Sequence, residues 1–212
     1  MRPGRHTGLF FAAALAVAAA ADAQSLPTAA PNDNRRPAGL LGDGALVLRL
    51  EAVMARWYPE GPTGPAREVQ TFAEEGRQPQ VPGPLIRVPS GTDIRVTITN
   101  RLAMPLRIRG LIEHPGDAGA VTEVAPGTAR ELTFDAGDAG TYLYWATTVS
   151  ATIAERNQID SQLSGAFVVD PRRAEERVDD RVFVITEWLG PPAAPPRKFT
   201  AAINGLSWPH TD

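Results

Sequence analysis

The strongest constraint on the fold is an alternating stretch within residues 82–110. Over residues 94–99, three β-branched apolar side chains alternate with three polar ones, which predicts a strand with one apolar and one polar face. Proline and glycine punctuate the chain just before it, at residues 82–84 and 89–91. A second short strand is expected over residues 106–111. Two half-buried strands joined by short turns are typical of a β-sandwich.

Composition favours the same fold class. The 212 residues include 19 Gly and 20 Pro, with 43% hydrophobic and 21% charged residues. Chains with many short apolar runs between Pro and Gly turns favour sandwiches over helical bundles. The net charge of −3 gives no reason to expect nucleic acid or an anionic membrane surface as a partner.

Cysteine is absent from the chain. Disulfides, a thiolate nucleophile and any cysteine metal ligand are therefore excluded. A blue-copper centre requires a cysteine thiolate with two histidines, so this chain alone cannot form one. The sequence also lacks the G-x-S-x-G, H-E-x-x-H and Gly-rich phosphate-loop motifs.

The N-terminal 44 residues precede the first expected long strand. Residues 1–23 combine a basic start, an apolar run and the small-x-small sequence Ala21-Asp22-Ala23, which together predict a signal peptide. A retained membrane anchor is the alternative. Residues 24–44 mix Pro and Asn with little periodicity, so we expect a disordered linker there.

Three blocks carry a family resemblance. Residues 82–110 read PGPLIRV, then a turn, then VTITNRL; residues 140–147 read GTYLYWAT; residues 161–170 read SQLSGAFVVD. In this order they resemble the N-terminal plastocyanin-like (cupredoxin) domain of multicopper oxidases. The resemblance implies an all-β, Greek-key cupredoxin-type sandwich over residues 45–171. Residues 172–212 would then be a connector and the start of a truncated second cupredoxin domain.

The resemblance also identifies the positions of copper ligands. Family members carry H-x-H-G in the last strand of the first block and two further histidines in the second block. Here the matching residues are Arg107, Arg109, Trp145 and Thr147. We therefore predict no catalytic, cofactor-binding or metal-binding residue at these positions. Copper belongs to the full-length family, and none is expected from this chain alone.

Three histidines are present. His6 lies in the predicted signal peptide, and His210 lies near the C-terminal end. His114 precedes a proline close to the strand that binds copper in the family, which makes it the one alternative ligand. A solvated or hydrogen-bonded histidine is the favoured interpretation, because a copper site needs several converging donors.

The replacing residues leave two interpretations open. Arg107 and Arg109 lie two apart on a strand and share one face. Guanidinium groups have no lone pair to donate to a metal, so the pair is either a solvated face or an anion-binding or domain-facing pair. Trp145 and Thr147 also share a face, and a packed tryptophan is the favoured interpretation for Trp145. Four carboxylates in or beside loops form no convincing acid–base pair: Glu113, Asp117, Glu123 and Asp160.

Two functional hypotheses follow from the resemblance. In the first, the chain is the N-terminal cupredoxin domain of a secreted or periplasmic multicopper-oxidase-like protein. Family members pass electrons from a reducing substrate through copper centres to dioxygen, and the partners of this domain would be the remaining cupredoxin domains of the same polypeptide. In the second, it is a non-catalytic structural or docking module. A lone exported binding protein is a third option. None of these involves nucleic acid, or a membrane after signal cleavage, and whether the protein is an enzyme stays open.

Overall fold

The computed structural model describes residues 25–172, 180–190 and 198–211. The predicted signal peptide over residues 1–23 lies outside these ranges, as do connector residues 173–179. Regular structure in the described ranges consists of strands alone, which confirms the all-β prediction. Among the residues described, no helix has the length and apolar character needed to cross a membrane.

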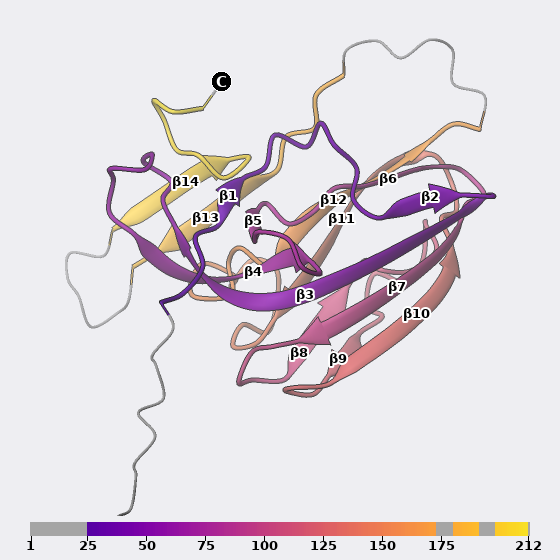
Figure 1. Ribbon diagram of the computed structural model, residues 1–212, viewed down its shortest axis with the longest axis horizontal. Coiled ribbons are helices and arrows are strands. Elements are labelled where there is room, and N and C mark those ends of the chain that lie inside the picture. The colour runs from indigo at the N-terminus through magenta and orange to yellow at the C-terminus, as the bar shows by residue number, and fades with distance from the viewer. Residues whose placement is uncertain (1–24, 173–179, 191–197, 212) are drawn as a thin grey trace, which may run out of the picture.

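The first sheet has the strand order β1-β5-β4-β3-β7-β10, with β2 paired to β3 (Figure 1). Its long central strand β3 pairs antiparallel with β4 and parallel with β7. This mixture of neighbours requires crossovers between the sheets, as in a Greek key. The strands are β1 (Ala30–Pro31), β2 (Leu40–Gly42), β3 (Ala45–Trp57), β4 (Arg67–Glu74), β5 (Gln80–Val81), β7 (Asp93–Asn100) and β10 (Ala129–Asp135).

The second sheet has the order β6-β12-β11-β8-β9. The central strand β11 pairs antiparallel with β12 on one side and with β8 on the other. The strands are β6 (Ile86–Pro89), β8 (Leu106–Arg109), β9 (Thr122–Val124), β11 (Gly140–Thr147) and β12 (Ser164–Asp170). The two strands quoted for the family resemblance, β11 and β12, are therefore neighbours at the middle of this sheet.

The core lies between the two sheets. In β7 the apolar residues Ile94, Val96 and Ile98 are buried while their neighbours are exposed or half-buried, as the alternation predicts. Phe72 from the first sheet packs on Tyr144 from the second, with 5.4 Å between ring centroids. Burial of such alternating faces is the main stabilising term of a sandwich.

Tyr144 links the three resemblance blocks. Its buried hydroxyl donates to the Pro84 carbonyl at 2.5 Å, and burial raises the pKa of this hydroxyl far above its ordinary value. A Cβ atom added at Gly165 would lie 2.4 Å from the Tyr144 ring, and one at Gly83 would lie 3.0 Å from its hydroxyl. The glycines of the first and third blocks therefore make room for the tyrosine of the second.

The first and third blocks also meet through an ion pair. Arg87 of β6 donates to both carboxylate oxygens of Asp170 in β12, at 2.9 and 2.7 Å, and it also contacts Asp180. Both side chains of the Arg87–Asp170 pair are about nine-tenths buried. A two-point contact of this kind fixes the parallel register of β6 on β12.

The expectation of a disordered linker over residues 24–44 is wrong for the part that the structure describes. Strand β1 pairs with β5, and β2 pairs with β3. Ala29 and Ala38 are buried, and their amides donate to the Arg56 and Leu85 carbonyls at 2.8 Å. The prolines do not prevent this order, because edge strands tolerate residues without an amide donor.

The C-terminal segment forms a hairpin of its own, with β13 (Ile185–Leu189) antiparallel to β14 (Phe199–Ile203). Ala202 and Trp188 pack with Trp57 of β3, and the Trp57 indole donates to the Gly205 carbonyl at 2.7 Å. Figure 1 shows this yellow hairpin beside β1. The segment expected to open a second domain therefore has one face buried against the sandwich.

The Tyr144 hydroxyl provides a test of this packing. We expect Tyr144→Phe to lower the free energy of unfolding by roughly 1–3 kcal/mol, because it removes the donor to the buried Pro84 carbonyl. The matched control is Tyr142→Phe, whose hydroxyl makes an exposed bond to Asp138 at 3.0 Å. Urea denaturation should show a control loss below about 0.5 kcal/mol. Equal losses in the two variants would contradict the proposed role of Tyr144.

Candidate functional site

The four positions that correspond to family copper ligands come together on one face of the second sheet. The antiparallel register of β8 and β11 places Trp145 opposite Arg109 and Thr147 opposite Arg107. Residues directly opposite in such a pair project to the same face. Because the alternate residues Ile108 and Ala146 belong to the core, these four side chains point away from it.

Two arginines stack on Trp145. The guanidinium carbon of Arg109 lies 4.8 Å from the indole centroid, and that of Arg156 lies 5.6 Å from it. Both distances are within the range of cation–π attraction. Arg109 has no hydrogen-bond partner among the described residues, and its Nη1 atom is buried without one. Trp145 is therefore packed, as the sequence predicts, and its packing partners include the guanidinium groups of Arg109 and Arg156.

Arg156 was not found from the sequence. It lies in the loop after β11 and is only 8% exposed. It donates to the Asp160 and Ser161 carbonyls at 3.3 and 2.6 Å, whereas its Nη1 atom has no partner in the described chain. Burial lowers the pKa of Arg156 to about 10, although the nearby charge of Asp160 raises it. No spacing in the sequence links this loop residue to Trp145.

Asp160 holds this loop through hydrogen bonds to its backbone and to Ser150. This fully buried carboxylate accepts the amides of Thr148, Val149 and Ser150 at 3.1, 3.2 and 3.0 Å. It also accepts the Ser150 hydroxyl at 2.9 Å. Four hydrogen bonds from loop donors therefore make Asp160 the capping group of this loop.

Arg107 and Thr147 complete the face. Arg107 is half-buried and donates to the Ser150 carbonyl at 3.0 Å. Thr147 is fully buried, and its hydroxyl has no partner within the described ranges. The interpretation of Arg107 and Arg109 as a simple solvated face therefore does not hold, since both are half-buried and engaged with the loop or the indole.

These side chains do not fit copper. Protein copper is bound by imidazole nitrogens and by thiolate or thioether sulfur. The four positions present two guanidiniums, an indole and a hydroxyl, and guanidinium and indole nitrogens offer no free lone pair to a cation. Across residues 25–172, 180–190 and 198–211, no three His, Cys, Asp or Glu residues gather closely enough to hold a metal ion.

His114 lies in an aromatic environment. Its ring stacks on Tyr142 with 3.9 Å between centroids and meets the edge of Phe167 at 5.0 Å. Its Nε2 atom is 3.2 Å from the Gly110 carbonyl oxygen. Burial lowers the pKa of His114, while the Gly110 contact partly opposes that shift. The side chain is hydrogen-bonded and buried rather than solvated.

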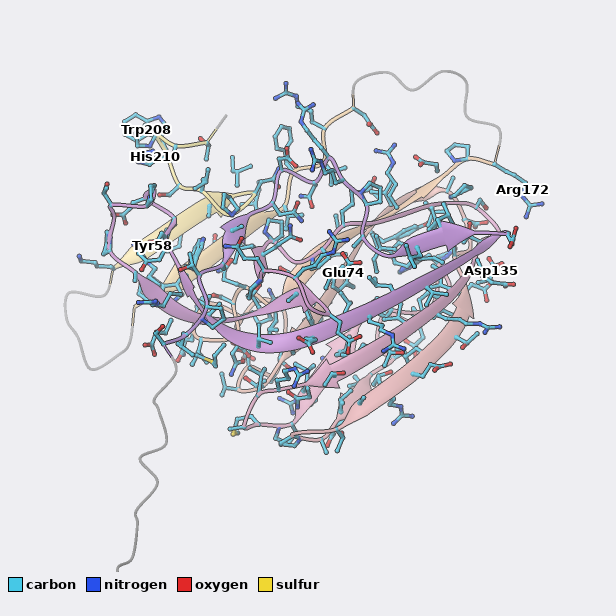
Figure 2. All side chains as sticks on the ribbon, in the orientation of Figure 1. Tyr58, Glu74, Asp135, Arg172, Trp208 and His210 are labelled. Carbon is cyan, nitrogen blue, oxygen red and sulfur yellow. The ribbon has the colours of Figure 1, made fainter. Side chains whose placement is uncertain are left out.

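The other candidates from the sequence lie apart from this site. Figure 2 shows His210 beside Trp208 at the C-terminal end of the described chain, and a Cβ atom added at Gly61 would lie 3.5 Å from its ring. Among the loop carboxylates, Glu113, Asp117 and Glu123 are exposed, in contrast to buried Asp160. The structure thus yields no acid–base pair among these four in the described chain.

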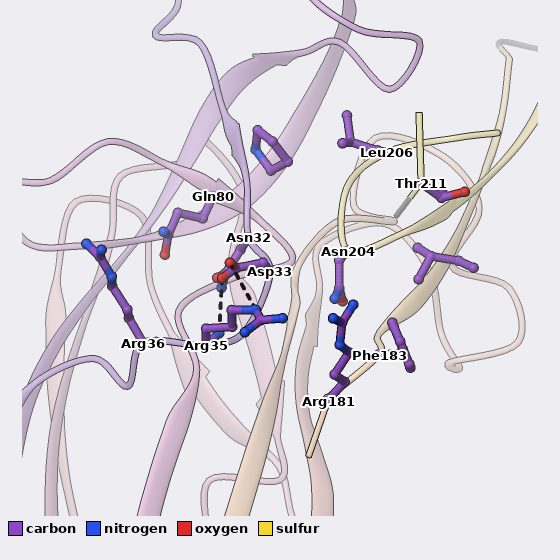
Figure 3. A pocket seen from close by; sticks show the side chains of 12 residues that line it. Asn32, Asp33, Arg35, Arg36, Gln80, Arg181, Phe183, Asn204, Leu206 and Thr211 are labelled. Atoms are coloured by element: carbon purple, nitrogen blue, oxygen red, sulfur yellow. Dashed lines mark hydrogen bonds and ion pairs between the residues drawn. The ribbon is translucent and has the colours of Figure 1, made fainter. Parts of the chain in front are cut away.

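A separate pocket of about 520 Å³ lies between the N-terminal segment and the C-terminal hairpin (Figure 3). Three arginines line it, and one of these, Arg35, pairs with Asp33 at 3.7 Å. Figure 3 shows Arg181 close to Asn204 on the hairpin side. None of the four family ligand positions borders this pocket. Its remaining lining is mixed polar and apolar.

The strand order and the two packed sheets define a cupredoxin-type β-sandwich. The chain belongs to the multicopper oxidase family, because the family model described as "Multicopper oxidase" matches residues 64–174, just over half of its length. All strands of the second sheet lie within the matched range.

The sequence is similar to part of a much larger fusion protein. A probable nitrite reductase-hydroxylamine oxidoreductase fusion protein from Kuenenia stuttgartiensis is 29% identical over 152 residues. This match covers 68% of the present chain and 17% of the relative. The chain therefore spans about a sixth of that protein.

Solved structures share the fold. A multicopper oxidase has a TM-score of 0.57 at 24% identity, with 83% of this chain and 60% of that chain covered. The blue copper oxidase of Nitrosomonas europaea has a TM-score of 0.57 at 23% identity, with 78% of this chain and 55% of that chain covered. The copper nitrite reductase of the same organism has a TM-score of 0.59 at 19% identity, with 76% of this chain and 57% of that chain covered.

The environment of His114 predicts a pH effect on stability. Because burial lowers its folded-state pKa, the unfolded chain binds a proton more readily, and stability falls as the pH drops below about 6.5. The variant His114→Phe keeps an aromatic ring but loses the titrating group. We expect its unfolding free energy to decline less than that of the wild type between pH 7.5 and 5. His210 remains in both proteins, so identical slopes would contradict this assignment.

Proposed function

We propose that this chain is the N-terminal cupredoxin domain of a secreted or periplasmic multicopper-oxidase-like protein, and that it contributes structure and interdomain contact rather than copper ligands. The observation that carries this proposal is the stack of Arg109 and Arg156 on Trp145. It fills the face where family members present imidazoles. Two cations at that place oppose the binding of a third.

The greater length of the relatives supports the proposal that this chain is one domain of a larger protein. The chain spans 60% of one multicopper oxidase and a smaller share of the fusion protein. Partners of this domain would be further cupredoxin domains of the same polypeptide, and any copper would be held by those domains. The oxidation of a reducing substrate would then also depend on them.

A docking module without any oxidase activity is the second candidate. The outward face of the β13–β14 hairpin favours it, because Ile185 is 70% exposed and Phe199 is 60% exposed. Exposed apolar side chains on neighbouring strands are typical of interaction surfaces. Histidine- and cysteine-containing copper motifs elsewhere in the polypeptide would favour the oxidase-like protein, and their absence would favour the module.

Copper titration tests the main proposal. The purified chain, titrated with Cu(I) and Cu(II) against a chelator of known affinity, should bind no stoichiometric copper, because the site offers no lone-pair nitrogen. It should also consume no dioxygen in the presence of a reductant.

The variant His114→Gln is the control, because His114 is the one alternative copper ligand that the sequence suggests. If the wild type binds one copper and the variant does not, His114 is a ligand and the proposal is wrong. Stoichiometric copper binding that survives in His114→Gln would contradict it as well.

A further inference from the structure

The Arg109–Trp145–Arg156 cluster has hydrogen-bond donors that the described chain does not use. Arg109 makes no hydrogen bond within the described residues, and Arg156 leaves Nη1 unpartnered although it is 92% buried. Nearly all buried polar groups in folded proteins have partners. Charged donors are the most costly to leave unsatisfied. These two guanidiniums therefore need an acceptor that the described chain does not provide.

Three carboxylates lie near the cluster, and none of them forms an ion pair with Arg109 or Arg156 within the described residues. Asp160 accepts four loop donors with its two oxygens. Glu155 accepts the Ala151 and Thr152 amides at 3.2 and 3.1 Å. Glu123 lies opposite Arg107 on β9, but it is exposed. Asp160 lies near enough to Arg156 for its charge to act on it, but neither arginine of the cluster has an ion-pair contact with these groups in the described structure.

The geometry selects the kind of acceptor. Both guanidinium carbons lie within 6 Å of the centroid of the same indole, so two positive charges surround one side chain. An anion bound beside Trp145 would be attracted by both charges. The guanidinium fork matches the two oxygens of a carboxylate, and a stacked, half-buried fork loses little conformational entropy on binding.

We propose that the Arg109–Trp145–Arg156 cluster is a carboxylate-binding site. The carboxylate bonds to the guanidinium of Arg109, and Arg156 adds a second positive charge beside Trp145. This inference rests on the proposed function only in taking the face to be free of copper. The ligand is either a free small carboxylate or an acidic side chain of another protein segment.

The experiment measures carboxylate binding through the NMR signal of the Trp145 indole. The indole N–H signal of Trp145 is assigned in the ¹H–¹⁵N spectrum by its loss in Trp145→Phe. The purified chain is then titrated with acetate at constant ionic strength, with neutral acetamide as the matched ligand. We expect saturable movement of this signal with acetate and none with acetamide.

Two arginine variants locate the site. Arg109→Gln should weaken acetate binding about tenfold, the loss expected for charge-assisted hydrogen bonds. Its fold should persist, because Arg109 makes no hydrogen bond in the described structure. The control is Arg130→Gln, which removes an exposed arginine from β10 of the other sheet and should leave binding unchanged. Unfolding midpoints of all variants report any loss of structure separately.

The outcomes are distinct. A Trp145 signal that does not respond to acetate, responds equally to acetamide, or responds equally in Arg109→Gln would overturn the inference. Tighter binding of the blocked amino acid N-acetyl-glutamate α-amide than of acetate would identify a protein side chain as the source. Tighter binding of acetate would identify a free anion. Copper titration has a separate readout, so the proposed function and this inference can fail independently.

Discussion

The antiparallel register of β8 on β11 determines what this molecule can bind. It places Arg109 opposite Trp145 and Arg107 opposite Thr147, with the core residues Ile108 and Ala146 between them. A shift by one residue would exchange the two faces and bury both guanidiniums in the core. The apolar residues therefore fix the register, and the register in turn gathers the polar side chains on the outer face.

Close backbone packing, which does not involve a metal, explains the shape of the scaffold around this face. Gly110, which ends the family ligand motif, has a φ of 78°. A Cβ atom there would lie 2.2 Å from the Leu143 carbonyl oxygen, so only glycine allows β8 to approach β11 this closely. Gly110, Tyr144 and the two glycines beside Tyr144 pack these strands together through contacts that do not involve the four ligand positions. A conserved fold and a changed chemistry are compatible for this reason.

Sequence reasoning predicted the features that depend on local pattern. The alternation in β7 and the GTYLYWAT block of β11 gave the strand positions, and the family resemblance gave the four positions that meet on one face. It did not find Arg156, because this residue lies in a loop outside the three blocks and is held beside Trp145 by bonds to the Asp160 and Ser161 carbonyls. It also missed the order of residues 25–44, since their prolines conceal edge strands whose amides bind distant carbonyls such as that of Leu85.

The central claim is that a stacked pair of arginines occupies the place of copper ligands on this face. The most direct measurement is an anomalous difference map at the copper absorption edge, from crystals of the purified chain grown with copper. The account predicts density for the two guanidiniums against Trp145 and no anomalous peak between β8 and β11. A copper peak within bonding distance of side chains at Arg107, Arg109, Trp145 or Thr147 would contradict it.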